Sequence, residues 1–138
     1  MSNQGITPNL RYVHTVYEDI SDTVATASEK VIECAGAKGV ALTLTAKDNA
    51  GERALKLEVD VSIDGTNYVG YNMLIDNLAN TNAEGLTRVD SKIRNADGTD
   101  IIWMDPETLG GITHLKVKAE RTGAGSAGTF TVTATVVF

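Results

Sequence analysis

The chain has a single cysteine among its 138 residues, Cys34, so it cannot form an intrachain disulfide. Its first residues, Met-Ser-Asn-Gln-Gly, supply neither the basic segment nor the apolar segment of a secretory signal peptide. Disulfides are rare in proteins that fold in a reducing compartment. We therefore expect synthesis and folding in a reducing cytoplasm.

Long hydrophobic runs and an excess of basic charge are also missing. No apolar run approaches the roughly 20 residues that a membrane-spanning helix needs. Lys and Arg number 12 against 18 Asp and Glu, which gives a formal net charge of −6. An acidic surface repels phosphate backbones and anionic lipid headgroups. The composition therefore argues against nucleic acid and membrane as partners.

The sequence lacks motifs of catalysis and cofactor binding. Residues 123–128 match G-x-G-x-x-G, but a dinucleotide site requires this motif to open a helix, and here it joins two alternating segments. His14, His114 and Cys34 have no spacing typical of a zinc site or of a nucleophilic triad. Carboxylates are numerous enough for a glycosidase pair, but no spacing indicates one. We therefore expect no enzyme activity, no cofactor and no bound metal.

The sequence is rich in strict alternation of apolar and polar residues. Between Ala54 and Asp64 the aliphatic members are Leu55, Leu57, Val59, Val61 and Ile63. A period of two is typical of a strand with one face on a core and the other in water. Asp64-Gly65 follows and predicts a hairpin turn, because glycine accepts positive φ and aspartate tolerates it.

Similar alternation recurs at residues 40–47, 113–120 and 129–138. Shorter strands are predicted at residues 22–27, 30–34, 68–75 and 88–94, a helical turn is possible at residues 81–84, and Asp105-Pro106-Glu107 predicts a capped helical turn. About eight to ten short strands with little helical pattern indicate an all-β fold, an antiparallel β-sandwich with jelly-roll-like topology; a small barrel is the second choice. We expect an N-terminal arm at residues 1–20 and a sandwich domain at residues 21–138.

Residues 10–19 have no clean apolar face. One side of a strand here would carry Tyr12, His14, Val16 and Glu18, and the other would carry Arg11, Val13, Thr15 and Tyr17. Two interpretations remain open: a first strand packed at the edge of the sandwich, or an extended arm that reaches a neighbouring subunit. The arm interpretation makes five residues candidates for a partner interface: Arg11, Tyr12, Val13, Val16 and Tyr17.

Aromatic residues make up only 5% of the chain, and Trp103 is the only tryptophan. A carbohydrate-binding sandwich needs exposed aromatic rings to stack on sugars, for which Trp103, Tyr68 and Tyr71 are the candidates. Trp103 lies between Ile102 and Met104, which favours burial in the core or in an interface. We therefore add Trp103 to the partner-interface candidates and keep a sugar-binding module as the rival class.

Residues 62–68, Ser-Ile-Asp-Gly-Thr-Asn-Tyr, resemble the S-x-D-G-[TG]-x-[WY] hairpin of small β-sandwich structural proteins of tailed bacteriophages. Residues 111–117, followed by residues 123–132, are similar to the closing strand pair of these proteins. The resemblance extends over residues 23–138. Proteins of this kind often serve as head decoration, or cement, proteins on capsids, and related sandwiches occur in tails.

The resemblance implies a non-enzymatic virion protein that binds the capsid surface after synthesis in the host cytoplasm and stabilises the head lattice. Its implied partners are the major capsid protein and further copies of itself, with a trimer favoured. A tail or baseplate component and a carbohydrate-binding module on the virion are the alternatives.

Overall fold

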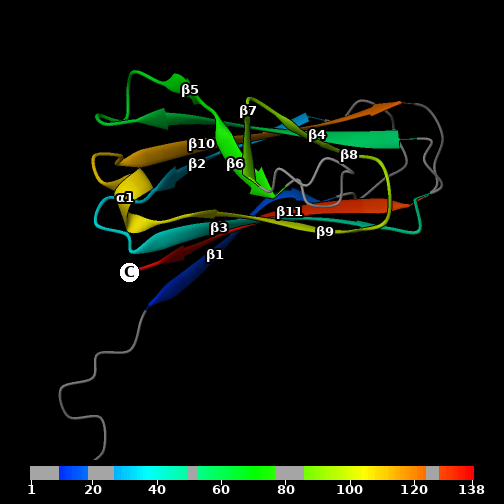
Figure 1. The fold of residues 1–138 in the computed structure, drawn as a ribbon, viewed down its shortest axis with the longest axis horizontal. Coiled ribbons are helices and arrows are strands. Elements are labelled where there is room, and N and C mark those ends of the chain that lie inside the picture. Colours follow the sequence, from blue (N-terminus) through cyan, green and yellow to red (C-terminus); the bar gives the residue numbers. More distant parts are fainter. Residues whose placement is uncertain (1–9, 19–26, 50–52, 77–85, 124–127) are drawn as a thin grey trace, which may run out of the picture.

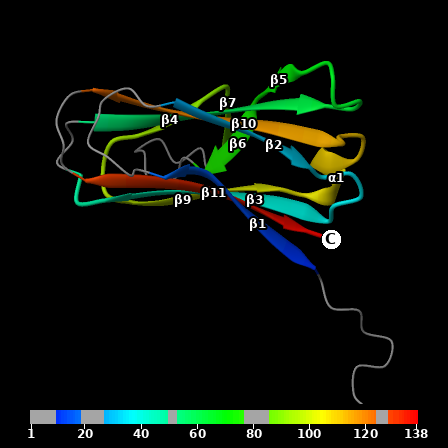
Figure 2. The same cartoon turned by 180° about the vertical axis from the view of Figure 1, so that it is seen from behind.

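The computed structural model describes residues 10–18, 27–49, 53–76, 86–123 and 128–138. Its elements are β1 (Arg11–Glu18), β2 (Ala27–Glu33), β3 (Gly39–Lys47), β4 (Arg53–Ser62), β5 (Val69–Tyr71), β6 (Met73–Asp76), β7 (Leu86–Val89), β8 (Lys92–Arg94), β9 (Gly98–Met104), α1 (Pro106–Leu109), β10 (His114–Gly123) and β11 (Thr129–Val137). Two sheets lie face to face, so the fold is the predicted all-β sandwich (Figures 1 and 2). No helix within the described ranges is long and apolar enough to cross a membrane.

In each sheet, a strand from the start of the chain lies next to a strand from its end. One sheet has the order β1-β11-β3-β9, and the other has the order β2-β10-β4-β5, with β8 also pairing with β4. All of these pairs are antiparallel. Successive strands from β1 to β4 alternate between the sheets, and β10 and β11 return between them. This is the double-sheet arrangement of a jelly roll. A separate ribbon of β6 and β7 completes the described strands.

The core is built from the inner faces of both sheets. Leu42 and Leu44 of β3 and Leu55 and Leu57 of β4 are fully buried in one hydrophobic cluster. Burying an aliphatic side chain of this size stabilises a fold by about 1.5–3 kcal/mol. Most aliphatic residues of the strict alternation in the sequence are therefore those that form this core.

The predicted turn at Asp64-Gly65 is confirmed, with Gly65 at φ 79°. Asp64 Oδ1 accepts hydrogen bonds from the backbone N–H groups of Thr66 and Asn67, both at 2.8 Å. These bonds favour the charged carboxylate and hold the pKa of Asp64 well below its usual range. The predicted helical cap is also confirmed, because Asp105 Oδ1 accepts from Thr108 N at 2.8 Å.

β1 is a strand of the sandwich, and a β-bulge explains why its sequence has no clean face. The register with β11 shifts between Thr15 and Tyr17, so that Val16 is an extra residue. Tyr12 lies opposite Val136, whose side chain is buried in the core, and after the bulge Tyr17 lies opposite the buried Val132. Residues 12 and 17 thus share the inner face despite their opposite parity.

The boundary predicted between an arm and a sandwich at residue 20 therefore needs correction. Residues 11–18 pair with β11 along the first sheet and belong to the sandwich, which is the edge-strand interpretation of this segment. Residues 1–9 and 19–26 lie outside the described residues.

Three other strand predictions differ from the structure. Residues 68–75 and 88–94 each contain two strands instead of one, because β5 and β8 pair with opposite ends of β4 and the chain leaves this edge between them. Ala27–Glu33 is a single strand that runs through the break predicted at residues 28–29. The possible helical turn at residues 81–84 lies outside the described residues.

Candidate interaction surface

The outer face of the β1-β11-β3-β9 sheet carries an uncharged set of side chains. The strand register places Val13, Thr135, Ala41 and Trp103 in one row across the sheet, and Thr15, Thr133, Thr43 and Ile101 in the next. A third row begins with Glu18 on β1 and continues with Thr131, Thr45 and Thr99, where the hydroxyls of Thr45 and Thr99 lie 3.2 Å apart. We call the eleven uncharged residues of these three rows the threonine face.

Large apolar side chains stand exposed on the two outer strands of the threonine face. Val13 on β1 is 66% exposed, and Ile101 and Trp103 on β9 are 68% and 52% exposed. The Trp103 ring lies against the backbone of Gly39, where any added Cβ would overlap it. The absence of a side chain at Gly39 therefore leaves the space that the Trp103 ring occupies.

Charges on this side of the sheet stand at its margins. Arg11 and Glu18 lie at the two ends of β1, and Lys47 lies at the end of β3 opposite Thr129. A partner that covers the threonine face would meet hydroxyl, methyl and aromatic groups without having to desolvate a central charge.

The outer face of the β2-β10-β4 sheet has the opposite character. It carries alternating acids and bases that pair across strands, including Lys118 with Asp60 at 3.0 Å and Lys116 with Glu29 at 4.0 Å. The hydrogen bond that Lys118 donates to the Asp60 carboxylate raises the pKa of Lys118 above its usual value. The Lys116 ammonium also lies 4.2 Å from the centre of the Tyr68 ring. This face is mainly a mosaic of charges, with the exposed Val31 of β2 among them.

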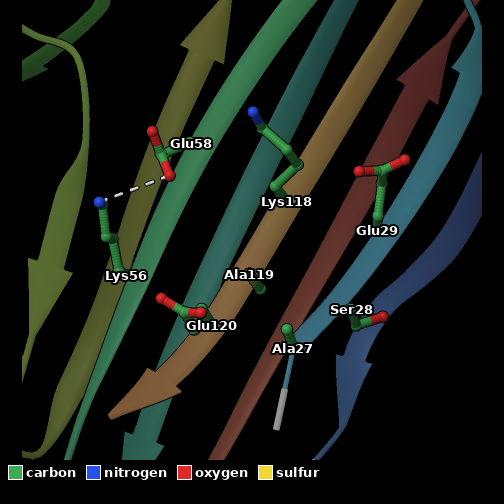
Figure 3. Close-up of a pocket in the computed structure, with 8 residues that line it drawn as sticks. All are labelled: Ala27, Ser28, Glu29, Lys56, Glu58, Lys118, Ala119 and Glu120. Carbon is green, nitrogen blue, oxygen red and sulfur yellow. Dashed lines mark ion pairs between the residues drawn. The ribbon is translucent and has the colours of Figure 1, made fainter. Parts of the chain in front are cut away.

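A shallow hollow of about 270 Å³ lies on this charged side, over β2, β10 and β4 (Figure 3). Its charged lining is mixed: Glu29, Lys56, Glu58, Lys118 and Glu120. Lys56 pairs with Glu58 at 3.6 Å within it. Acids and bases that already pair with each other offer little net charge to select an ionic ligand.

In the described part of the chain, the candidate groups for chemistry divide between a buried thiol and an open groove that both histidines line. Cys34 is fully buried, and its thiol lies 3.9 Å from the backbone oxygen of Ile112. Burial raises the pKa of the Cys34 thiol to about 11, so the thiol stays protonated at neutral pH. His14 and His114 both line an open groove between β1 and β2. Among the described residues, no group of three or more His, Cys, Asp or Glu side chains is placed to hold a metal ion.

Four of the six predicted interface residues are at least partly exposed, on one side or the other of the first sheet. Arg11, Val13 and Trp103 lie on the outer side of the same sheet, although Trp103 is distant from the other two in the sequence. Tyr12 is on the inner side of β1, half exposed, with its ring 5.8 Å from that of Phe138 in an edge-on contact.

Val16 and Tyr17 do not fit the prediction that they contact a partner. They are only 4% and 3% exposed, because the bulge turns both toward the core of their own chain. Ile101 was missed by sequence reasoning, although its spacing of two from Trp103 on a strand already placed both on one face.

Comparison with known proteins finds a shared fold. The crystal structure of the SPBc2 prophage-derived protein YomS matches with a TM-score of 0.57 and 13% sequence identity, over 96% of this chain and 97% of that chain. The infectious bursal disease virus VP2 subviral particle matches with a TM-score of 0.45 and 14% identity, over 94% of this chain and 33% of that chain. No protein-family model and no curated protein sequence matches the chain.

Proposed function

We propose that the protein is a non-enzymatic structural component of a bacteriophage virion, a decoration protein that binds the major capsid protein on the head surface and stabilises the lattice. The observation that carries the proposal is the threonine face, a whole sheet surface without a central charge, opposite a sheet surface that is a charge mosaic. The threonine face is the attachment surface in this proposal.

The physical argument rests on the small cost of covering this face. Its hydroxyls can exchange water for partner hydrogen bonds, and its exposed valine, isoleucine and tryptophan gain about 25 cal/mol for each Å² of apolar area removed from water. Trp103, seated on Gly39, is a preorganised anchor of the kind that dominates binding energies. A standard interface buries on the order of 1,500 Å². Binding of many copies to the intact lattice alone would oppose its disassembly.

The fold agrees with this proposal. Jelly rolls occur in viral capsid and lectin domains. The likeness to a prophage-derived protein extends over nearly the whole of both chains. Together with the resemblance of the Ser62 to Tyr68 hairpin to those of phage sandwich proteins, this likeness supports a virion role.

The test is attachment to heads that lack the protein. Ile101→Lys, which places a charge in the middle row of the threonine face, should reduce co-sedimentation with such heads at least tenfold. Ile63→Lys is the matched control, because Ile63 is 73% exposed against 68% for Ile101 and lies in the hairpin turn of the other sheet. Equal attachment by both variants would refute the threonine face as the attachment surface. Gold labelling of intact virions would decide between the head and the tail or baseplate.

A sugar-binding module is the second candidate, because Trp103 is half exposed instead of buried. Stacking of a sugar on this ring would retard the protein in affinity electrophoresis through polysaccharide gels, and Trp103→Ala would abolish the retardation. The decoration proposal expects the wild-type protein to migrate without retardation.

A further inference from the structure

Residues 10–15 of β1 form a stretch of sheet edge that lacks the usual protection. β1 pairs with β11 on one side, and no described strand pairs with its other side. Edge strands are commonly protected by short length, proline, charged side chains or β-bulges. β1 is eight residues long, contains no proline, has its charges only at its ends, Arg11 and Glu18, and has its bulge at Val16, beyond residues 10–15.

The end strands β2, β5 and β9 of the two main sheets carry such protection. β2 carries the exposed charges Glu29, Lys30 and Glu33, and β5 is only three residues long. On β9, Asp100 forms ion pairs with Lys92 and Arg94 of β8, at 3.9 Å and 3.3 Å. β1 is therefore the described edge best suited to pair with another strand.

The backbone of β1 defines which of its groups are available for pairing. Phe138 N donates to Leu10 O at 2.8 Å, which makes residues 10 and 138 a hydrogen-bonded pair of the antiparallel ladder. Hydrogen-bonded and non-hydrogen-bonded pairs alternate, so residues 12 and 14 also turn their N–H and C=O groups toward β11. The backbone groups of Arg11, Val13 and Thr15 point away from the sheet.

Exposed apolar side chains flank these outward groups on both faces of β1. Leu10 and Tyr12 are 57% and 50% exposed on the inner side, and Val13 is 66% exposed on the outer side. The bulge at Val16 ends the regular part of the strand. The pairing window is therefore residues 10–15.

We propose that β1 pairs antiparallel with β1 of a second copy of this chain, on a two-fold axis that passes through Val13. In this register, Val13 faces the partner's Val13, and Arg11 faces the partner's Thr15. All three outward residues of each copy then find partners, in about six backbone hydrogen bonds, two for each facing pair. Shifting the register in either direction would pair an outward residue with the bulge or with a position outside the window.

The side chains agree with this register. Arg11 opposes a threonine and Tyr12 opposes the partner's His14, so no two like charges of the window stand directly opposite each other. The first sheets of the two copies join into one continuous sheet, and their threonine faces become one surface of doubled width. The pairing does not depend on the proposed function, because it is a property of the protein in free solution.

Sedimentation equilibrium of the full chain tests the pairing. A small interface of this kind predicts a dimer with a dissociation constant on the order of 10 μM. Val13→Lys places two lysines against each other on the axis and should weaken dimerisation at least tenfold. Val69→Lys is the matched control, because Val69 is also 66% exposed but lies on β5, and it should leave the dimer intact. Thermal unfolding of both variants verifies that they remain folded.

Oxidative cross-linking tests the register independently of stability. Val13→Cys places two thiols on residues whose Cα atoms are about 5.5 Å apart, within disulfide range. Thr15→Cys is the control, because its Cα lies about 14 Å along the strands from the partner's Thr15. The buried Cys34 does not compete.

Efficient cross-linking of Val13→Cys alone would support the proposal. Three results would each overturn it: a monomer at concentrations far above the expected dissociation constant, the trimer that the family resemblance implies, or cross-linking of Thr15→Cys in place of Val13→Cys.

Discussion

The role of β1 in the fold can be tested with two tyrosines of the same strand. Tyr17 is 3% exposed in the core, whereas Tyr12 is 50% exposed at the strand's free end. Replacing Tyr17 by alanine removes a buried aromatic ring and leaves a cavity, which typically lowers the free energy of unfolding by about 3–5 kcal/mol. Replacing Tyr12 removes the edge-on contact with Phe138 and some partly buried area, for a loss of about 1 kcal/mol.

The assay is urea unfolding followed by circular dichroism, with thermal unfolding beside it. For a chain of this length, 1 kcal/mol corresponds to about 3–5 °C in Tm, so Tyr17→Ala should lower Tm by about 9–25 °C and Tyr12→Ala by about 3–5 °C. Each substitution deletes the same atoms from the same strand, so the difference reports burial. Small and equal losses would refute the assignment of β1 to the core and restore the interpretation of this segment as an arm.

Three further predictions follow from single groups. Asp64→Asn should be less stable than the wild type at pH 7, and the difference in urea midpoint between the two proteins should shrink as the pH falls below about 4. The reason is that the pKa of Asp64 is lowered in the folded state. The stabilisation by the Asp64 carboxylate is therefore present above the unfolded pKa and is lost as the pH falls toward the folded pKa. A gap that stays constant with pH would contradict this. Gly39→Ala should displace the Trp103 ring and shift its fluorescence, whereas Gly111→Ala, at a site with open space around it, should not. Cys34 should react with a thiol reagent at pH 8 at least about 100-fold more slowly in the folded protein than in urea, because burial raises the pKa of its thiol; comparable rates would place the thiol at the surface.

The places where sequence and structure differ have local physical causes. Alternation predicts which side chains share a face only while the strand pairing is regular. The bulge at Val16 exchanges the inner and outer positions for the residues after it, and no residue type in the sequence indicates this bulge. For this reason the sequence predicted Val16 and Tyr17 as partner-interface residues, although both are buried in the structure. The apolar neighbours of Trp103 in the sequence predicted that it lies in the core or in an interface. In the structure Trp103 is half exposed, on the same face as Ile101.

The sequence by itself determined the all-β class, the principal long strands and the Asp64-Gly65 turn, because each depends on side-chain periodicity and local turn chemistry. Only the tertiary structure decided the pairing of β1 with β11 and β3 with β9, since strand order depends on contacts between segments distant along the chain. That pairing brings Val13 and Trp103 into one row of an uncharged face and leaves β1 as an open edge. Which residues share a surface depends on which strands are neighbours, and the sequence of a single strand does not determine its neighbours.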